Sequence, residues 1–161
     1  LCDRRQRQMC IRDRLHTCLD TSGHLGANAD EELLANTDLV LLDIKAWNPE
    51  RYRALAGGEL RPTLEFAERL AALRKPVWLR YVLVPGLTDN MEDITELSRH
   101  AARLGNVERV DVLPFHQMGR FKWDELKLDY TLKDVPEPSE ELTEQVRDIF
   151  RQEENLKSSV H

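Results

Sequence analysis

The sequence predicts an α/β fold built on a parallel sheet, and two observations carry this prediction. Short apolar runs rich in β-branched residues alternate with longer stretches whose apolar residues recur at helical spacing. The short runs are nearly continuous in apolar character, which is typical of strands in parallel sheets. Strands and helices joined by short links form βαβ units, so the strands belong either to a small open sheet or to part of a β/α barrel.

Four segments match the strand pattern. Pro85 and Gly86 end the third segment and Pro114 ends the fourth, since proline cannot donate a hydrogen bond to a sheet ladder. The expected strands lie at residues 16–21, 39–45, 77–84 and, within residues 107–115, at 110–113.

Helices are expected between and after these strands. Pro49 suits the first turn of a helix, and Asn90 and Ser139 can each cap the helix that follows. Gly105 provides a C-terminal stop. We expect residues 121–138 to be irregular because they show no helical spacing. The expected helices lie at residues 30–35, 49–56, 63–74, 91–104 and 140–152.

Composition indicates a soluble globular protein of one domain. The chain has 161 residues, of which 41% are hydrophobic and 32% charged. Its net charge of −6 makes it a poor general binder of nucleic acid, whose affinity rests on neutralising phosphates. No apolar run approaches the roughly 20 residues that a membrane span requires. We therefore expect a cytoplasmic protein with no nucleic-acid or membrane partner.

The first 14 residues differ from the rest, since they contain five Arg, no Lys and two Asp. We expect residues 1–14 to be a non-native or disordered head; a basic nucleic-acid arm is the alternative. The three cysteines, Cys2, Cys10 and Cys18, match no zinc or iron–sulfur spacing, so no metal ligand is predicted from them. Cys18 lies in an apolar run and is expected to be buried and reduced.

Polar residues appear near the carboxyl end of each expected strand. Side chains alternate along a strand, so Leu41, Asp43 and Lys45 share one face. Taken singly, Asp43 and Lys45 could form a simple exposed ion pair, and His116 could be structural. Repetition at one end of four strands favours the mouth of a barrel, and the mixture of charges suits a zwitterionic ligand. The residues are Asp20, Thr21, Asp43, Lys45, Arg80 and, just past the fourth strand, His116.

Four motifs at these positions occur in order along the chain: HTCLDTSG at 16–23, LLDIK at 41–45, WLRYVLVPG at 78–86 and LPFH at 113–116. Together they resemble the radical S-adenosylmethionine (SAM) enzymes that activate glycyl-radical enzymes, the pyruvate formate-lyase activating enzymes in particular. Residues 119–132 continue the similarity, which covers about residues 15–150. The resemblance implies a partial β/α barrel of six strands, of which residues 15–161 would form the last four strand–helix units.

The resemblance also implies a reaction and its participants. In the family a 4Fe-4S cluster and SAM, supplied with an electron by a flavodoxin-type reductant, generate a radical that takes hydrogen from a glycine of pyruvate formate-lyase. By position, Asp43, Ile44, Lys45 and His116 match SAM-contacting residues. Asp20, Thr21, Asp43 and the carbonyl of Leu41 match a monovalent-cation site beside SAM, and Arg80 matches a residue on the substrate side.

One departure from the family concerns the cluster itself. The CxxxCxxC motif that binds it, and the glycine-rich motif after the family's second strand, do not occur in this sequence. We therefore expect this chain, alone, to be an incomplete and inactive monomeric fragment without a cluster. The alternatives are an activating enzyme for another glycyl-radical enzyme, a non-catalytic module that binds a ligand or partner, and an unrelated α/β domain with structural ion pairs.

Overall fold

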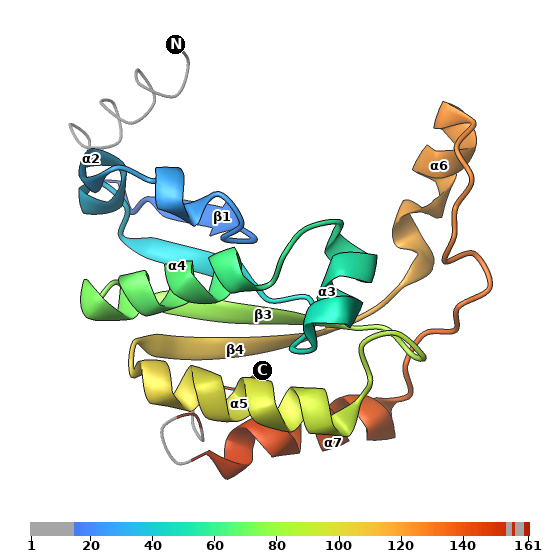
Figure 1. Ribbon diagram of the computed structural model, residues 1–161. Helices are drawn as coiled ribbons and strands as arrows, with labels where there is room; N and C mark the ends of the chain where they lie inside the picture. The colour runs from blue at the N-terminus through green and yellow to red at the C-terminus, as the bar shows by residue number, and fades with distance from the viewer. Residues whose placement is uncertain (1–14, 154–155, 157–159) are drawn as a thin grey trace.

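The computed structural model describes residues 15–153, 156 and 160–161, so the expected head at residues 1–14 lies outside the described residues. Its centre is one parallel sheet in the order β1-β2-β3-β4 (Figure 1). The α/β class predicted from the sequence is confirmed. The strands are β1 (Cys18–Thr21), β2 (Leu39–Asp43), β3 (Val77–Leu83) and β4 (Val107–Pro114).

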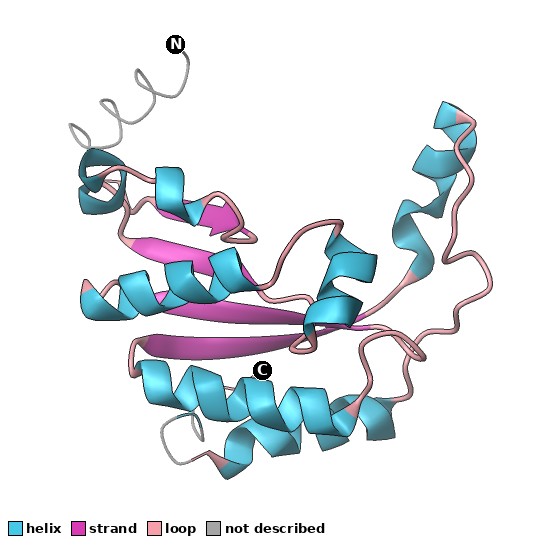
Figure 2. Ribbon diagram, viewed as in Figure 1, coloured by secondary structure: helices cyan, strands magenta, loops and turns pink. Residues whose placement is uncertain are grey.

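Helical segments connect and follow the strands (Figure 2). The predicted caps are confirmed, since Asn90 accepts a hydrogen bond from Asp93 N–H and Ser139 accepts one from Leu142 N–H. The segments are η1 (Gly26–Asn28), α2 (Glu31–Ala35), α3 (Pro49–Ala56), α4 (Arg61–Ala72), α5 (Met91–Leu104), η2 (Gln117–Gly119), α6 (Arg120–Leu126) and α7 (Glu140–Gln152). None in the described part of the chain is long and apolar enough to span a lipid bilayer.

Two features of the fold differ from the sequence-based expectation. The prediction that residues 121–138 are irregular is wrong at their start, where α6 forms a helix. The helix buries none of its residues, so its sequence carries no apolar periodicity. In addition, Val160 forms a parallel bridge with Val110, and His161 exchanges backbone hydrogen bonds with Val110 and Val112. This C-terminal segment therefore lies beside the outer edge of β4.

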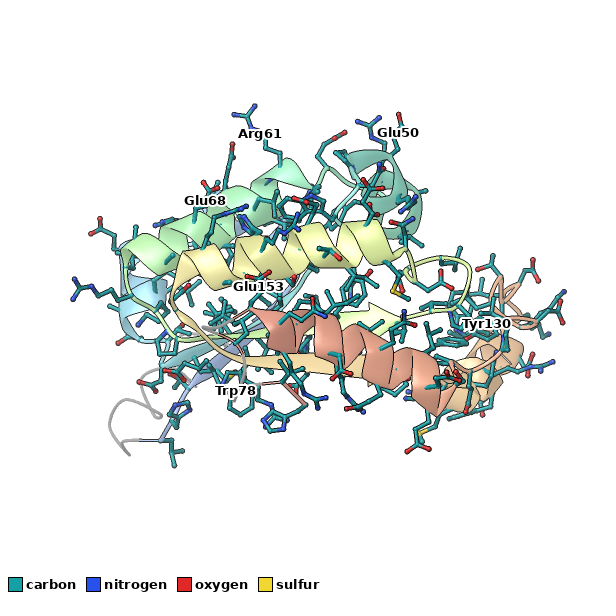
Figure 3. All side chains as sticks on the ribbon, turned by 90° about the horizontal axis from the view of Figure 1, so that it is seen from below. Glu50, Arg61, Glu68, Trp78, Tyr130 and Glu153 are labelled. Carbon is teal, nitrogen blue, oxygen red and sulfur yellow. The ribbon has the colours of Figure 1, made fainter. Side chains whose placement is uncertain are left out.

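The core lies between one face of the sheet and helices α4 and α5. Alternate residues of the strands, such as Val40, Leu42 and Leu79, are at most 2% exposed. Helix α7 packs against α5 and β4, and Phe150 contributes a fully buried ring. The opposite face of the sheet, here called the open face, carries half-exposed side chains, and Figure 3 shows Trp78 on the side away from α4.

The expectation that Cys18 is buried is wrong. Cys18 begins β1, which is an edge strand of the sheet, and its thiol is free and exposed. Alternation along β1 places Cys18 and Asp20 on the open face, while Leu19 packs against the core. An apolar run does not show which of two neighbouring residues faces the helices. At this edge, alternation along β1 turns Leu19 toward the helices and Cys18 away from them.

A buried histidine lies on the helix-covered side. His100 in α5 is 7% exposed, and its ring lies 5.1 Å from the ring of Trp47, centroid to centroid. Within the described residues, His100 Nε2 has no hydrogen-bond partner. Burial lowers the pKa of His100 below its usual 6.5, the charge of Arg103 lowers it further, and Glu68 opposes them.

We predict that stability falls with decreasing pH because of this histidine. The unfolded chain binds the proton at a higher pH than the folded chain, so the contribution of His100 is complete above about pH 6.5 and is lost as the pH falls through the lowered value. His100→Phe keeps a ring against Trp47 and removes the titration. Urea denaturation at a series of pH values should show a smaller acid loss for this variant than for the exposed-site control His24→Asn. Equal pH profiles for both variants would contradict the assignment.

Candidate functional site

The predicted polar residues lie at the carboxyl edge of the sheet. All neighbouring strands are parallel, so their carboxyl ends meet at one edge. Asp43 is the last residue of β2 and lies opposite Arg80 of β3 in the strand register. Side-chain alternation turns Leu41 and Asp43 to the same face, as predicted, which is the open face, and it buries Val40 and Leu42.

Four of the predicted residues form one continuous ionic network. Arg80 donates through Nη2 to Asp20 Oδ1, and through Nε to Asp43 Oδ1 at 2.7 Å. Lys45 Nζ donates to the other oxygen, Asp43 Oδ2, also at 2.7 Å. The Asp43 and Arg80 side chains are 18% and 21% exposed, whereas that of Asp20 is 63% exposed. Asp43 is therefore the shielded centre of the network, with a cation on each of its oxygens.

The environment keeps Arg80 charged. Burial opposes the charge and acts to lower its pKa, but hydrogen bonds to Asp20 and Asp43 outweigh burial and raise the pKa above the ordinary value. The guanidinium joins three strands, because Arg80 belongs to β3, Asp43 to β2 and Asp20 to β1. A planar fork with several fixed donors suits this role better than the single ammonium of lysine.

His116 lies at the same edge of the sheet, two residues beyond β4, and is exposed. Its Nδ1 accepts a hydrogen bond from Met118 N–H at 3.3 Å, so the neutral ring carries its proton on Nε2. The hydrogen bonds and ion pairs of the described residues do not connect His116 to the ionic network. The structure thus brings four of the five charged or titratable residues into contact and places the fifth on the same edge.

The other predicted site residues contribute unequally. Thr21 Oγ1 accepts a hydrogen bond from Gly23 N–H at 3.0 Å, which shapes the turn after β1. Leu41 is half-buried within β2. The Ile44 side chain is 1% exposed in the core, and Ile44 N–H donates to the carbonyl of Arg80. A ligand at this edge can therefore meet only the backbone of Ile44.

Three residues of the open face were not predicted as part of the site. Arg109 Nε donates to Asp111 Oδ1 at 2.7 Å, and its guanidinium lies 4.7 Å from the centroid of the Trp78 ring. Asp111 is 14% exposed and lies opposite Arg80 in the register of β3 and β4. The polar residues at 109 and 111, alternating with apolar ones, were the available signal in the sequence.

Comparison with known proteins identifies the family. The sequence model of the radical SAM superfamily matches residues 2–98. The chain belongs to this superfamily. It is 40% identical over 145 residues to the pyruvate formate-lyase 1-activating enzyme of Escherichia coli K12, covering 89% of this chain and 59% of the relative. It is 41% identical over 145 residues to the pyruvate formate-lyase-activating enzyme of Streptococcus mutans, covering 86% and 55%. The chain thus spans somewhat over half the length of these relatives.

Solved structures show the same fold. A domain of the pyruvate-formate lyase-activating enzyme from Bacteroides vulgatus superimposes with a TM-score of 0.75 at 19% identity, covering 96% of this chain and 85% of that chain. SuiB of Streptococcus suis, solved bound to S-adenosylmethionine, superimposes with a TM-score of 0.64 at 19% identity, covering 92% and 31%. The predicted partial barrel of the radical SAM type is confirmed.

The residues that the structure describes in this radical SAM chain fit some of the family's cofactors and not others. Two carboxylates beside an ammonium and a guanidinium are groups of the kind that can pair with the amino and carboxylate groups of SAM. The iron–sulfur cluster of the family has no such match, because the described residues contain no group of three His, Cys, Asp or Glu side chains placed to hold a metal ion. A monovalent cation between Asp20 and Asp43 would have to displace Arg80, which bridges these two carboxylates.

We predict that Arg80→Gln lowers the free energy of unfolding by about 1–3 kcal/mol. Among the described residues, the change leaves the shielded carboxylate of Asp43 with one cation and that of Asp20 with none. The matched control is Arg61→Gln, which removes a pair that is largely exposed on α4 and should cost less than about 0.5 kcal/mol. Urea denaturation of the two variants compares these costs. Equal losses would show that the ionic network does not stabilise the edge.

Proposed function

We propose that this chain forms the SAM-binding and substrate-facing part of an activating enzyme that places a glycyl radical in pyruvate formate-lyase. The observation that carries the proposal is the ionic network at the carboxyl edge of a radical SAM sheet. Two relatives at 40% and 41% identity are named as activating enzymes of pyruvate formate-lyase, which supports that protein as the substrate. A flavodoxin-type reductant, a monomeric state and a cytoplasmic location belong to the same proposal.

The residues of the edge have separate tasks in this proposal. The Lys45 ammonium pairs with the SAM carboxylate, and Asp43 accepts from the SAM amino group. His116, protonated on Nε2, offers a donor to the nucleoside part of the ligand. Arg80 holds Asp43 in place and faces the substrate side of the edge. The reductive cleavage of SAM is chemistry that the iron–sulfur cluster and SAM supply, while the protein positions the reacting groups.

A chimaeric enzyme tests the proposed function. Residues 15–161 replace the segment with which they align in the Escherichia coli pyruvate formate-lyase 1-activating enzyme, so that the relative supplies the rest of the protein. We expect the chimaera, assembled anaerobically, to generate the glycyl-radical signal of pyruvate formate-lyase in electron paramagnetic resonance. SAM cleavage without that signal would favour another glycyl-radical enzyme as the substrate. Absence of both from a folded chimaera would exclude the function.

In the same chimaera we predict that Lys45→Met raises the KM for SAM about tenfold or more. A hydrogen bond to a charged group contributes about 1.5–3 kcal/mol, and tenfold corresponds to about 1.4 kcal/mol. The matched control is Lys133→Met, which removes an exposed lysine whose ion pair spans 3.9 Å. Initial rates of SAM cleavage at varied SAM concentration measure the effect. A KM shared by the two variants would remove Lys45 from the SAM site.

A further inference from the structure

An exposed apolar segment stands beside the proposed site. Residues 117–137, here called the arm, leave the carboxyl end of β4, and Figure 1 shows α6 projecting away from the sheet and its covering helices. Helix α6 buries none of its residues. Five large apolar side chains of the arm are exposed to solvent: Met118 by 76%, Phe121 by 55%, Trp123 by 40%, Leu126 by 68% and Leu128 by 54%.

Such a segment gains little from being folded on its own. Isolated helices shorter than about 12–15 residues are marginal in water, and α6 has 7 residues. Most helices in proteins are stabilised by packing an apolar face, but α6 buries none of its residues, and the stacking of Trp123 on Tyr130 is its one contact between aromatic rings among the described residues. Exposed apolar side chains gathered in one segment mark an interaction site more often than chance surface residues.

The arm is nevertheless fixed at its base. Gln117 Nε2 donates to the carbonyls of Leu132 and Val135, at 2.9 and 3.0 Å, so the outgoing and returning parts of the arm are tied together. Farther out, the rings of Trp123 and Tyr130 stack with their centroids 5.4 Å apart. The arm therefore holds its apolar side chains in a defined place, which reduces the entropy lost when a partner binds.

The apolar surface is continuous with the carboxyl edge of the sheet. Leu113, near the end of β4, is 39% exposed. His116 follows it and accepts a hydrogen bond from Met118 N–H, the first exposed apolar residue of the arm. A partner that binds the arm therefore lies next to the edge that carries the ionic network.

We propose that the arm is the docking surface for the protein that carries the substrate glycine, which makes this inference dependent on the proposed function. A reaction on the backbone of a folded protein needs a binding surface beside the site, and the arm provides one. An aromatic anchor among apolar side chains with a mixed charged rim is typical of protein–protein contacts. Anionic lipid is disfavoured because the arm has more acidic than basic residues: Asp124, Glu125, Asp129, Asp134 and Glu137 against Arg120, Lys122, Lys127 and Lys133.

Binding of the full 161-residue chain to purified pyruvate formate-lyase, measured by surface plasmon resonance, tests the proposal without any radical chemistry. We expect Leu126→Ser, and independently Phe121→Ser, to weaken binding about tenfold or more. The matched control is Leu73→Ser, which changes a leucine that is 53% exposed and ends α4 at the other edge of the sheet. It should change the affinity less than twofold. All three side chains are exposed, so circular dichroism and Tm should stay close to those of the unchanged chain.

The outcomes separate docking from catalysis. Arm variants that bind like the unchanged chain, or an unchanged chain that does not bind pyruvate formate-lyase, would overturn the docking surface. A self-associating chain that Leu126→Ser converts to monomers in sedimentation, with no change in binding to pyruvate formate-lyase, would assign the arm to a second copy instead. In the chimaera, Leu126→Ser should raise the KM for pyruvate formate-lyase and leave the KM for SAM unchanged. A radical formed equally well by both chimaeras would retain the proposed function and reject the docking surface.

Discussion

The arrangement of side chains at the carboxyl edge of the sheet depends on the guanidinium group of Arg80. Arg80 extends from β3 and contacts Asp43 on the neighbouring strand and Asp20 one strand farther away. Backbone hydrogen bonds set the register of the sheet, but they do not set the side-chain geometry at its end. The Arg80 contacts do so, because a planar donor with two carboxylate partners has few arrangements available. The position of Lys45 follows from them, since it binds the remaining oxygen of Asp43.

The open face is also balanced in charge, and this balance bears on ligand choice. Three carboxylates and three cations lie on this face. All except Lys45 belong to two rows of residues that are paired across the strands, and Lys45 lies just beyond the end of β2. A ligand with charge of one sign would leave part of this set uncompensated, and shielded unpaired charges are costly. A zwitterionic ligand can replace one ion pair within the protein by two ion pairs between protein and ligand, and so keep the charges balanced. The amino acid part of SAM is a zwitterion of this kind. The six residues are Asp20, Asp43, Asp111, Lys45, Arg80 and Arg109.

Sequence periodicity was enough to predict a helix and its bounds where the segment has both a buried face and a defined end. Helices α3, α5 and α7 have the predicted bounds, because Pro49, Asn90 and Ser139 mark their starts. In α5 and α7, buried side chains also recur at helical spacing. Periodicity failed for α6, which has no buried face. It also failed for Val160, whose pairing with β4 depends on a contact far away in the sequence.

The candidate site, too, could be predicted from the sequence only in part. Polar residues at strand ends are visible in the sequence, and alternation indicates that Asp43 and Lys45 share a face. Which cation binds which carboxylate is not visible, because the contact between Arg80 and Asp20 joins positions 60 residues apart across an intervening strand. Arg109 and Asp111 were missed for a related reason. No local pattern places them beside the predicted residues, since only the register of β4 with β3 puts Asp111 opposite Arg80.

The ionic network and the arm obtain their order from different sources, and this difference assigns them different tasks. The side chains of the network are held by partners within the sheet, so their geometry exists before any ligand arrives, as positioning of a reacting group requires. The arm is tied at its base by Gln117 and farther out by the stacked rings of Trp123 and Tyr130, but its exposed apolar side chains are not buried against the described residues. Exposed apolar side chains of this kind gain their packing contacts when a partner binds. We therefore propose that the chemistry belongs to the rigid edge and partner recognition to the arm. His116, which accepts a hydrogen bond from Met118 N–H, lies where the two meet.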